Sequence, residues 1–141
     1  MSRALQFGCV AIGGRGVLIE GAPGAGKSSL ALALIDRGAT LVGDDGVMLD
    51  VQAGRLIAAP HPQIAGKLEV RNVGLIDFPV SPPVPVALVL RLDAAAPRFI
   101  AEAGRITVEG VDLPLVELWP HSPVLALRAE IALNVHGLPI S

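Results

Sequence analysis

A glycine-rich stretch near the N-terminus has the residue types and the spacing of a phosphate-binding loop. It reads Gly-x-x-x-x-Gly-Lys-Ser and comprises Gly21, Ala22, Pro23, Gly24, Ala25, Gly26, Lys27 and Ser28. Glycines adopt backbone angles that other residues resist, so consecutive N–H groups can point at one anion. In such a P-loop the lysine reaches the outer phosphates of a nucleotide, and the serine hydroxyl joins the ligands of Mg²⁺. The spacing therefore predicts a nucleotide site that also holds Mg²⁺.

Two adjacent carboxylates, Asp44 and Asp45, follow the apolar segment Leu41-Val42-Gly43. Phosphoryl transfer needs a metal and a group that accepts the proton of the attacking hydroxyl. The two acids can divide that work, one on the Mg²⁺ side and the other aimed at the nucleophile. Capping of a turn or helix is the alternative role for one of them.

The flanking segments are those that would position both motifs. Apolar residues before Gly21 predict a strand, and Leu30, Ala31, Leu34 and Ile35 recur at helical spacing until Gly38. A further strand is expected at 41–43. Strand, loop, helix and strand form a βαβ unit, and ligands of such units lie beyond the carboxyl ends of the strands. The two acids are therefore expected to face the phosphates.

The rest of the chain reads as short strands and a closing helix. Strands are expected at 5–12, 47–51, 55–58, 84–92, 105–109 and 113–118, and 97–104 is expected to be irregular. Ser122 and Pro123 predict a helix start with Ser122 as N-cap, followed by one apolar face made of Val124, Leu127, Ile131 and Val135. Residues 66–77 fit no simple period, which is typical of functional sites.

Length, charge and composition restrict the possible classes. The chain has 141 residues, 52% of them hydrophobic, and a mean hydropathy of +0.60. This length predicts one domain over 1–141. The longest apolar runs are too short to span a membrane, so the apolar excess is interpreted as buried strands and a subunit interface. A net charge of −2 argues against a nucleic-acid partner.

Isolated reactive residues carry weaker signals. Cys9 is the one cysteine, and with no signal-like N-terminus it favours a reducing cytoplasm and a buried thiol. The three histidines lack metal-ligand spacing. Arg91 is interpreted as the solvated end of a strand, and Trp119 as a packing or interface residue.

The motifs together resemble the catalytic domain of HPr kinase/phosphorylase, which phosphorylates a serine of a phosphocarrier protein. The resemblance rests on residues 21–28, 41–45 and 68–77, the last similar to the signature I/L-E-I/V-R-G-L-G-I-I-D with Asn72 in place of a glycine. It implies an α/β fold with a P-loop, a core like that of phosphoenolpyruvate carboxykinase, a mixed sheet and a C-terminal helix. It also implies ATP and Mg²⁺, an HPr-like phosphocarrier partner and a hexameric homo-oligomer.

The resemblance also implies roles for individual residues. Asp45 matches the proton acceptor of the kinase reaction, and Arg71 lies in the signature. Ser28 and Glu69 match magnesium ligands of the family, and Asp44 is then expected to be the acid on the Mg²⁺ side. Arg98 is implied as a further active-site arginine, in a stretch that aligns loosely.

Three departures from the family pattern affect the expected activity. Gln6 stands where the family has a histidine, and glutamine cannot carry a proton near neutral pH. Residues 121–123 replace a Gly-Arg-Asn run, and the N-terminal domain of longer members is expected to be absent. These departures favour a serine kinase with weak reverse activity. An ATP-binding regulator without catalysis stays open, as does a small-metabolite kinase, although the scattered arginines argue against a metabolite lid.

Overall fold

The structure is a computed structural model that describes residues 3–139. Within these residues the chain forms eleven strands and two helices. Their bounds are β1 (Arg3–Leu5), β2 (Gly8–Ile12), β3 (Arg15–Gly21), α1 (Lys27–Asp36), β4 (Thr40–Gly43), β5 (Val47–Gln52), β6 (Arg55–Pro60), β7 (Lys67–Val70), β8 (Gly74–Asp77), β9 (Val84–Leu92), β10 (Gly104–Val108), β11 (Val111–Leu118) and α2 (Leu125–His136).

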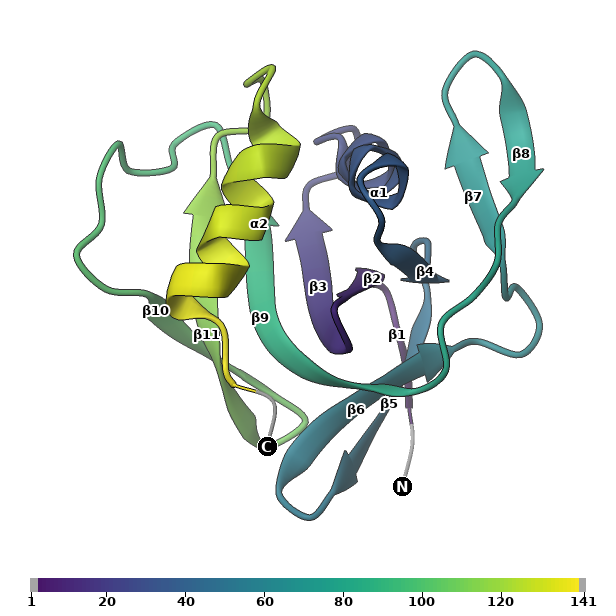
Figure 1. Cartoon of the computed structure of the whole chain (residues 1–141), viewed down its shortest axis with the longest axis horizontal. Helices are drawn as coiled ribbons and strands as arrows, with labels where there is room; N and C mark the ends of the chain where they lie inside the picture. The colour runs from purple at the N-terminus through teal and green to yellow at the C-terminus, as the bar shows by residue number, and fades with distance from the viewer. Residues whose placement is uncertain (1–2, 140–141) are drawn as a thin grey trace.

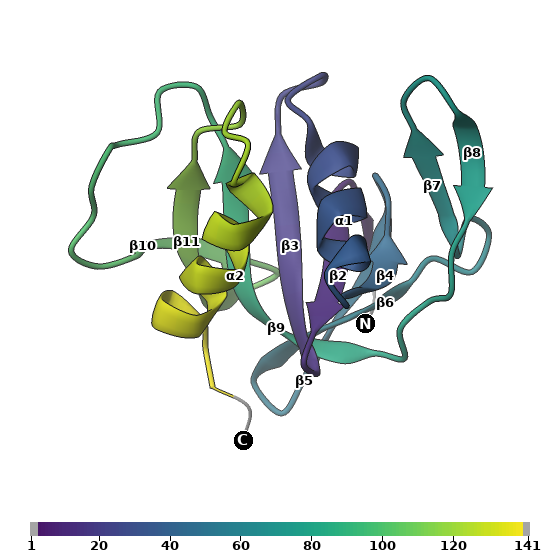
Figure 2. The ribbon, with the colours of Figure 1, turned by 45° about the horizontal axis from the view of Figure 1, so that its top comes forward.

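A mixed sheet forms the centre of the fold. Its path runs β1-β5-β6-β9-β3-β2-β4, and β11 extends it by pairing with both β9 and β10. Strand β9 is parallel to β3 and to β11, whereas its first two residues pair antiparallel with β6. The carboxyl ends of β3, β9 and β11 consequently lie at one edge of the sheet (Figure 2). The predicted mixed sheet is confirmed.

Both helices cover the same face of this sheet (Figure 1). Between them and the strands lies a cluster that includes Leu30 and Leu34 of α1, Leu90 of β9 and Leu133 of α2, all at most 2% exposed. A second cluster, with Leu18, Leu49 and Leu56, packs on the other side, where β5 and β6 fold under the sheet. Strand β9 contributes Leu88 and Leu90 to the first cluster and Val86 and Val89 to the second, so it is buried along most of its length, as the apolar run predicts.

The βαβ unit around the glycine-rich loop is confirmed, with one strand inserted. Strand β3 leads into the loop, α1 follows, and β4 ends at Gly43. Because β2 lies between β3 and β4 and is antiparallel to both, β4 is parallel to β3. The expected strand at 5–12 is interrupted at Gln6 and Phe7, where the chain passes from β1 to β2.

The segment without a simple period, residues 66–77, is a hairpin of β7 and β8 that forms its own two-stranded sheet. Leu68 is fully buried against the core that contains α1. The turn places Asn72 at φ 70°, a left-handed conformation that asparagine tolerates better than most residues. Figure 1 shows this hairpin standing beside α1, away from the main sheet.

The closing helix differs from its prediction at two points. It begins at Leu125, and Ser122 does not cap it, because the Ser122 hydroxyl accepts a bond from the Val124 N–H in the turn before the helix. The predicted apolar face is also exposed: Ile131 is 58% and Val135 67% accessible. The buried face instead consists of Ala129, Ala132 and Leu133, since small side chains let the helix approach the sheet closely.

In the described part of the chain, neither helix has the length and apolar character needed to cross a membrane. The fold contains no cis peptide bond among these residues.

Candidate active site

The glycine-rich loop connects β3 to α1 and is held open at the edge where the parallel strands end. Gly24 and Gly26 have φ of 81° and 103°, and an added Cβ at either would meet nothing within 4 Å. The Ala25 N–H donates to the Ala22 carbonyl at 3.0 Å, which closes the loop into a turn. Positive φ at alternate residues and an open interior are the properties of an anion-binding backbone concavity at a helix N-terminus.

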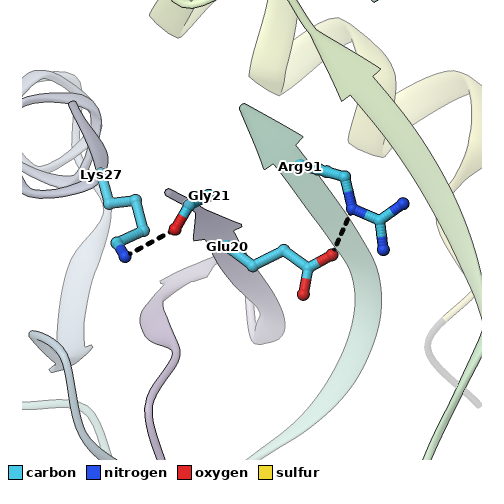
Figure 3. A network of polar contacts seen from close by, with 4 residues as sticks. All are labelled: Glu20, Gly21, Lys27 and Arg91. Atoms are coloured by element: carbon cyan, nitrogen blue, oxygen red, sulfur yellow. Dashed lines mark hydrogen bonds and ion pairs between the residues drawn. The ribbon is translucent and has the colours of Figure 1, made fainter. Parts of the chain in front are cut away.

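Lys27 begins α1 and folds back across this loop. Its Nζ donates to the Gly21 carbonyl oxygen at 3.0 Å (Figure 3). The ammonium group is therefore held at the β3 end of the loop, where the predicted role of Lys27 requires a positive charge.

Ser28, Asp44 and Glu69 meet at the first turn of α1. The Ser28 hydroxyl donates to Asp44 Oδ1 at 2.7 Å, and the Glu69 backbone N–H donates to Asp44 Oδ2 at 3.0 Å. Asp44 thus links the end of β4 to α1 and to the β7–β8 hairpin. Asp44 therefore lies beside the loop, while the expectation that both acids face bound phosphates stays a prediction.

The donor atoms gathered here suit Mg²⁺. The Ser28 hydroxyl and the Asp44 carboxylate are hard oxygen ligands in direct contact, and Glu69 lines the adjoining cavity with Ser28. Mg²⁺ is typically held by one or two carboxylates together with substrate phosphates. Among the residues described, no three or more His, Cys, Asp or Glu side chains cluster closely enough to hold a metal by themselves. The arrangement fits a metal that arrives with a nucleotide rather than one bound by a complete protein cage.

Three cavities adjoin the loop. One of about 250 Å³ is lined by Lys27, Ser28, Glu69 and Arg71, so the hairpin brings the predicted arginine to the same site. A second, of about 460 Å³, lies between α1 and the start of α2. The largest, about 730 Å³, extends from Gly21 to Ala25 past the ends of β3 and β9.

Gln6 lines the largest cavity, as its predicted position beside the nucleotide site requires. Leu5 pairs with Val47, and Cys9 pairs with Gly43, so residues 6–8 run alongside 44–46. This register places Asp45 opposite Phe7, which also lines the largest cavity, and Gln6 opposite Gly46. Asp45 itself is exposed, has φ 56° and lines none of these three cavities.

An ion pair that the sequence reading overlooked lies in the wall of the largest cavity. Arg91 Nε contacts Glu20 Oε1 at 2.6 Å, and both side chains are partly buried (Figure 3). Arg91 does lie near the end of β9 with its side chain 37% accessible, as interpreted, but that interpretation leaves out its pairing with Glu20. Glu20 and Arg91 are register partners on adjacent parallel strands. The available signal was a charge of opposite sign near the end of each apolar strand.

The structure does not bring Arg98 to the loop. It is exposed, in the irregular segment before β10, and lines a separate cavity with Glu117, Trp119 and Arg128. Trp119 is 46% exposed, and its ring stacks edge-on against His121. Cys9 is fully buried, and burial raises the pKa of its thiol to about 12, so it belongs to the core, as expected.

Comparisons with known proteins point to one family. The family model described as HPr Serine kinase C-terminal domain matches residues 2–81. HPr kinase/phosphorylase of Clostridium tetani is 48% identical over 66 residues, which are 47% of this chain and 22% of that protein. The corresponding protein of Bordetella pertussis is 52% identical over 66 residues, covering 46% of this chain and 21% of the relative. The matched segment thus spans about a fifth of the length of these relatives.

A solved structure extends the similarity to nearly the whole chain. The Hpr(Ser) kinase/phosphatase from Coxiella burnetii superposes with a TM-score of 0.83 at 28% identity, covering 94% of each chain. The α/β architecture with its mixed sheet and C-terminal helix is therefore shared with that enzyme.

Proposed function

The chain belongs to the family of the HPr serine kinase C-terminal domain, and on that premise we propose that it is an ATP-dependent protein-serine kinase whose acceptor is an HPr-type phosphocarrier. The observation that carries the proposal is the contact of Ser28 with Asp44 at the start of α1, beside Lys27. A lysine, a hydroxyl and a carboxylate at one helix N-terminus are what nucleotide phosphates and Mg²⁺ need.

The proposal also includes the nucleotide loop, the domain organisation and the magnesium ligands that the sequence predicts. We take residues 21–28 as a P-loop within a core of the phosphoenolpyruvate carboxykinase type, and the chain as one catalytic domain that works in the cytoplasm. Ser28, Asp44 and Glu69 would hold Mg²⁺, which supplies charge neutralisation between the outer phosphates. The open loop and the oxygen donors around Asp44 support this.

In the transfer step, Asp45 takes the proton of the serine hydroxyl. A bond forms between the serine oxygen and the γ-phosphorus, and the bond between that phosphorus and the ADP oxygen breaks. Lys27 and Arg71 offset the charge on the phosphoryl oxygens. The register of 44–46 against 6–8 supports the placement of Asp45 at the acceptor side, because Phe7, the residue opposite Asp45, lines the largest cavity.

The test is transfer of labelled phosphate from ATP to HPr-type carriers. Asp45→Asn should lower the rate at least about 100-fold, since general-base catalysis contributes that much, with ATP affinity nearly unchanged. Asp36→Asn, at the exposed end of α1, is the matched control and should keep the wild-type rate. An unchanged rate in Asp45→Asn would show that another group accepts the proton.

A second candidate function is an ATP-binding regulator without catalysis, and Gln6 favours it. An amide that cannot titrate lines the cavity where the family carries a histidine. The regulator predicts that ATP raises the melting temperature while no carrier is phosphorylated. For the kinase, Gln6 predicts forward transfer without phosphorolysis. Gln6→His should increase the formation of pyrophosphate from a phosphorylated carrier and inorganic phosphate.

We also propose that the chain forms a homo-oligomer, and the resemblance implies a hexamer. The exposed apolar residues of α2 support it, since Ile131 and Val135 are more than half accessible. Sedimentation equilibrium of the wild type and of Ile131→Asp tests this, and a wild type that stays monomeric at all concentrations would refute it.

A further inference from the structure

The three cavities around the glycine-rich loop are chemically different. The cavity between α1 and α2 is lined by apolar residues such as Leu30 and Ala126, together with Arg71 and His121. The largest cavity also has apolar residues and His121 in its lining, and it differs in holding a pair of opposite charges, Glu20 and Arg91. An arginine in a cavity beside a phosphate-binding loop can contact a phosphoryl group.

The position of Lys27 indicates which end of the loop takes the terminal phosphate. The lysine of such a loop contacts the outer phosphates. Here its ammonium lies at the Gly21 carbonyl, and Gly21 also lines the largest cavity. The acceptor hydroxyl should therefore enter from the largest cavity.

Arg91 is the arginine in that lining. Glu20 accepts from its Nε at 2.6 Å, and within residues 3–139 the two terminal nitrogens have no hydrogen-bond partner. Figure 3 shows these nitrogens pointing away from Glu20, on the side opposite Lys27. Because Glu20 holds the guanidinium through Nε, the two terminal N–H₂ groups stay fixed in one plane and can donate bidentate hydrogen bonds to phosphoryl oxygens.

We propose that Arg91 binds the phosphoryl group on the acceptor side of the site, with Glu20 as its positioning residue. This assignment rests on the proposed kinase function and deepens it. Lys27 would hold the phosphoryl group while it is on the nucleotide. Arg91, whose terminal nitrogens point away from Lys27, would take the group up on the carrier side as the serine oxygen–phosphorus bond forms. Arg98, which lines a different cavity, would then not contact the transferred group.

The experiment compares Arg91→Gln and Arg91→Lys with Arg37→Gln. Arg37 pairs with Glu130 at 2.9 Å on the surface, so its variant removes a similar ion pair away from the cavities. Arg91→Gln should lower kcat for carrier phosphorylation about 100- to 1,000-fold, as loss of one charge-stabilising donor does, with the Kd for ATP within about threefold of wild type. Arg91→Lys keeps the positive charge but loses the bidentate hydrogen-bond donors, so its kcat should lie between those of Arg91→Gln and the wild type. Arg37→Gln should retain wild-type kinetics.

A purely structural role for Arg91 predicts a different pattern. In that case Arg91→Gln would lower the melting temperature and weaken ATP binding with little change in kcat, and Arg91→Lys would restore both. Either that pattern or a kcat equal to that of Arg37→Gln would overturn the assignment. So would a large loss of kcat in Arg98→Gln with none in Arg91→Gln.

A melting-temperature experiment without the carrier protein tests the role of Arg91 independently of the proposed kinase function. Aluminium fluoride with ADP mimics the phosphoryl group in transfer, and it should raise the wild-type melting temperature above the value with ADP alone. Arg91→Gln should lose this increment, and Arg37→Gln should keep it. If no carrier is phosphorylated by the wild type yet this pattern holds, the proposed substrate fails and the role of Arg91 stands. An increment that Arg91→Gln retains would refute the role of Arg91.

Discussion

Asp44 carries two roles that two substitutions can separate. Its Oδ1 accepts from the Ser28 hydroxyl at 2.7 Å, and its Oδ2 accepts from the Glu69 N–H at 3.0 Å. In Asp44→Asn both bonds can persist. The amide oxygen accepts from the Glu69 N–H, and the amide nitrogen donates to a Ser28 hydroxyl that turns from donor to acceptor. Asp44→Ala removes both bonds.

The loss of unfolding free energy in Asp44→Ala can be estimated from these two hydrogen bonds. Each contributes about 1 kcal/mol net at a partly exposed site, so Asp44→Ala should lose about 2 kcal/mol of unfolding free energy. For a domain of this size that corresponds to a fall of about 6 °C in the melting temperature. Asp44→Asn should stay within about 0.5 kcal/mol of wild type, as surface changes that keep their hydrogen bonds usually do.

The assays are urea unfolding followed by circular dichroism and hydrogen exchange at the Glu69 amide, which should speed up in Asp44→Ala alone. Asp112→Ala serves as control, because Asp112 also accepts from a hydroxyl, that of Thr107 at 2.6 Å, but on an exposed hairpin away from the site. Stabilisation by Mg²⁺ and ATP should fall in both Asp44 variants, since both lose the charge. Equal stability of Asp44→Asn and Asp44→Ala would refute the claim that the two hydrogen bonds of Asp44 stabilise the fold. If Mg²⁺ and ATP stabilise Asp44→Asn as much as the wild type, Asp44 is not a ligand of Mg²⁺.

Four further outcomes are expected. Lys27→Met should abolish the rise in melting temperature with ATP, measured by thermal shift, while leaving the apo melting temperature nearly unchanged. Leu34→Ala, at a fully buried position in α1, should cost about 2–5 kcal/mol in urea unfolding. Asn72→Val should destabilise the chain by about 1–2 kcal/mol in the same assay, because a β-branched residue resists φ 70°, whereas Asn72→Gly should not. Burial raises the pKa of the Cys9 thiol from 9.0 to about 12, so Cys9 in the folded chain should resist iodoacetamide at pH 8. Between pH 9 and about pH 12 only the unfolded thiol ionises, so the free energy of unfolding should fall as the pH rises through this range. Cys9→Ala should remove this part of the pH dependence.

Strong local patterns allowed much of the fold to be predicted. The apolar run of β9 and the helical repeat after Ser28 each correspond to an element with nearly the expected bounds. The hairpin of β7 and β8 was not predicted, because β8 reads Gly-Leu-Ile-Asp without alternation and its turn uses Asn72 at a positive φ. Helix α2 is apolar on two faces, so periodicity alone could not show that its alanine face is the buried one.

In the candidate site too, contacts between contiguous motifs could be predicted and long-range contacts could not. The proximity of Lys27, Ser28 and Asp44 could be predicted because the loop and the strand-end acids are each contiguous motifs, while their roles stay predictions. The pairing of Glu20 with Arg91 spans 71 residues and depends on the register of two parallel strands, which no local pattern encodes. The location of Arg98 depends on the path of an irregular segment, for which the sequence offers no periodic signal.

The position of β9 in the sheet has a consequence for how the chain reaches its folded state. The strand pairs with β3, β6 and β11, and its pairing with β3 joins residues about 70 positions apart. Segments preceding Val84 therefore cannot complete either core before β9 is available. Such non-local parallel pairing is entropically costly and slow to form. On the ribosome, the glycine-rich loop should stay unprotected until Leu92 has left the exit tunnel. Nascent chains stalled before and after that point should show one late, cooperative gain of protease resistance.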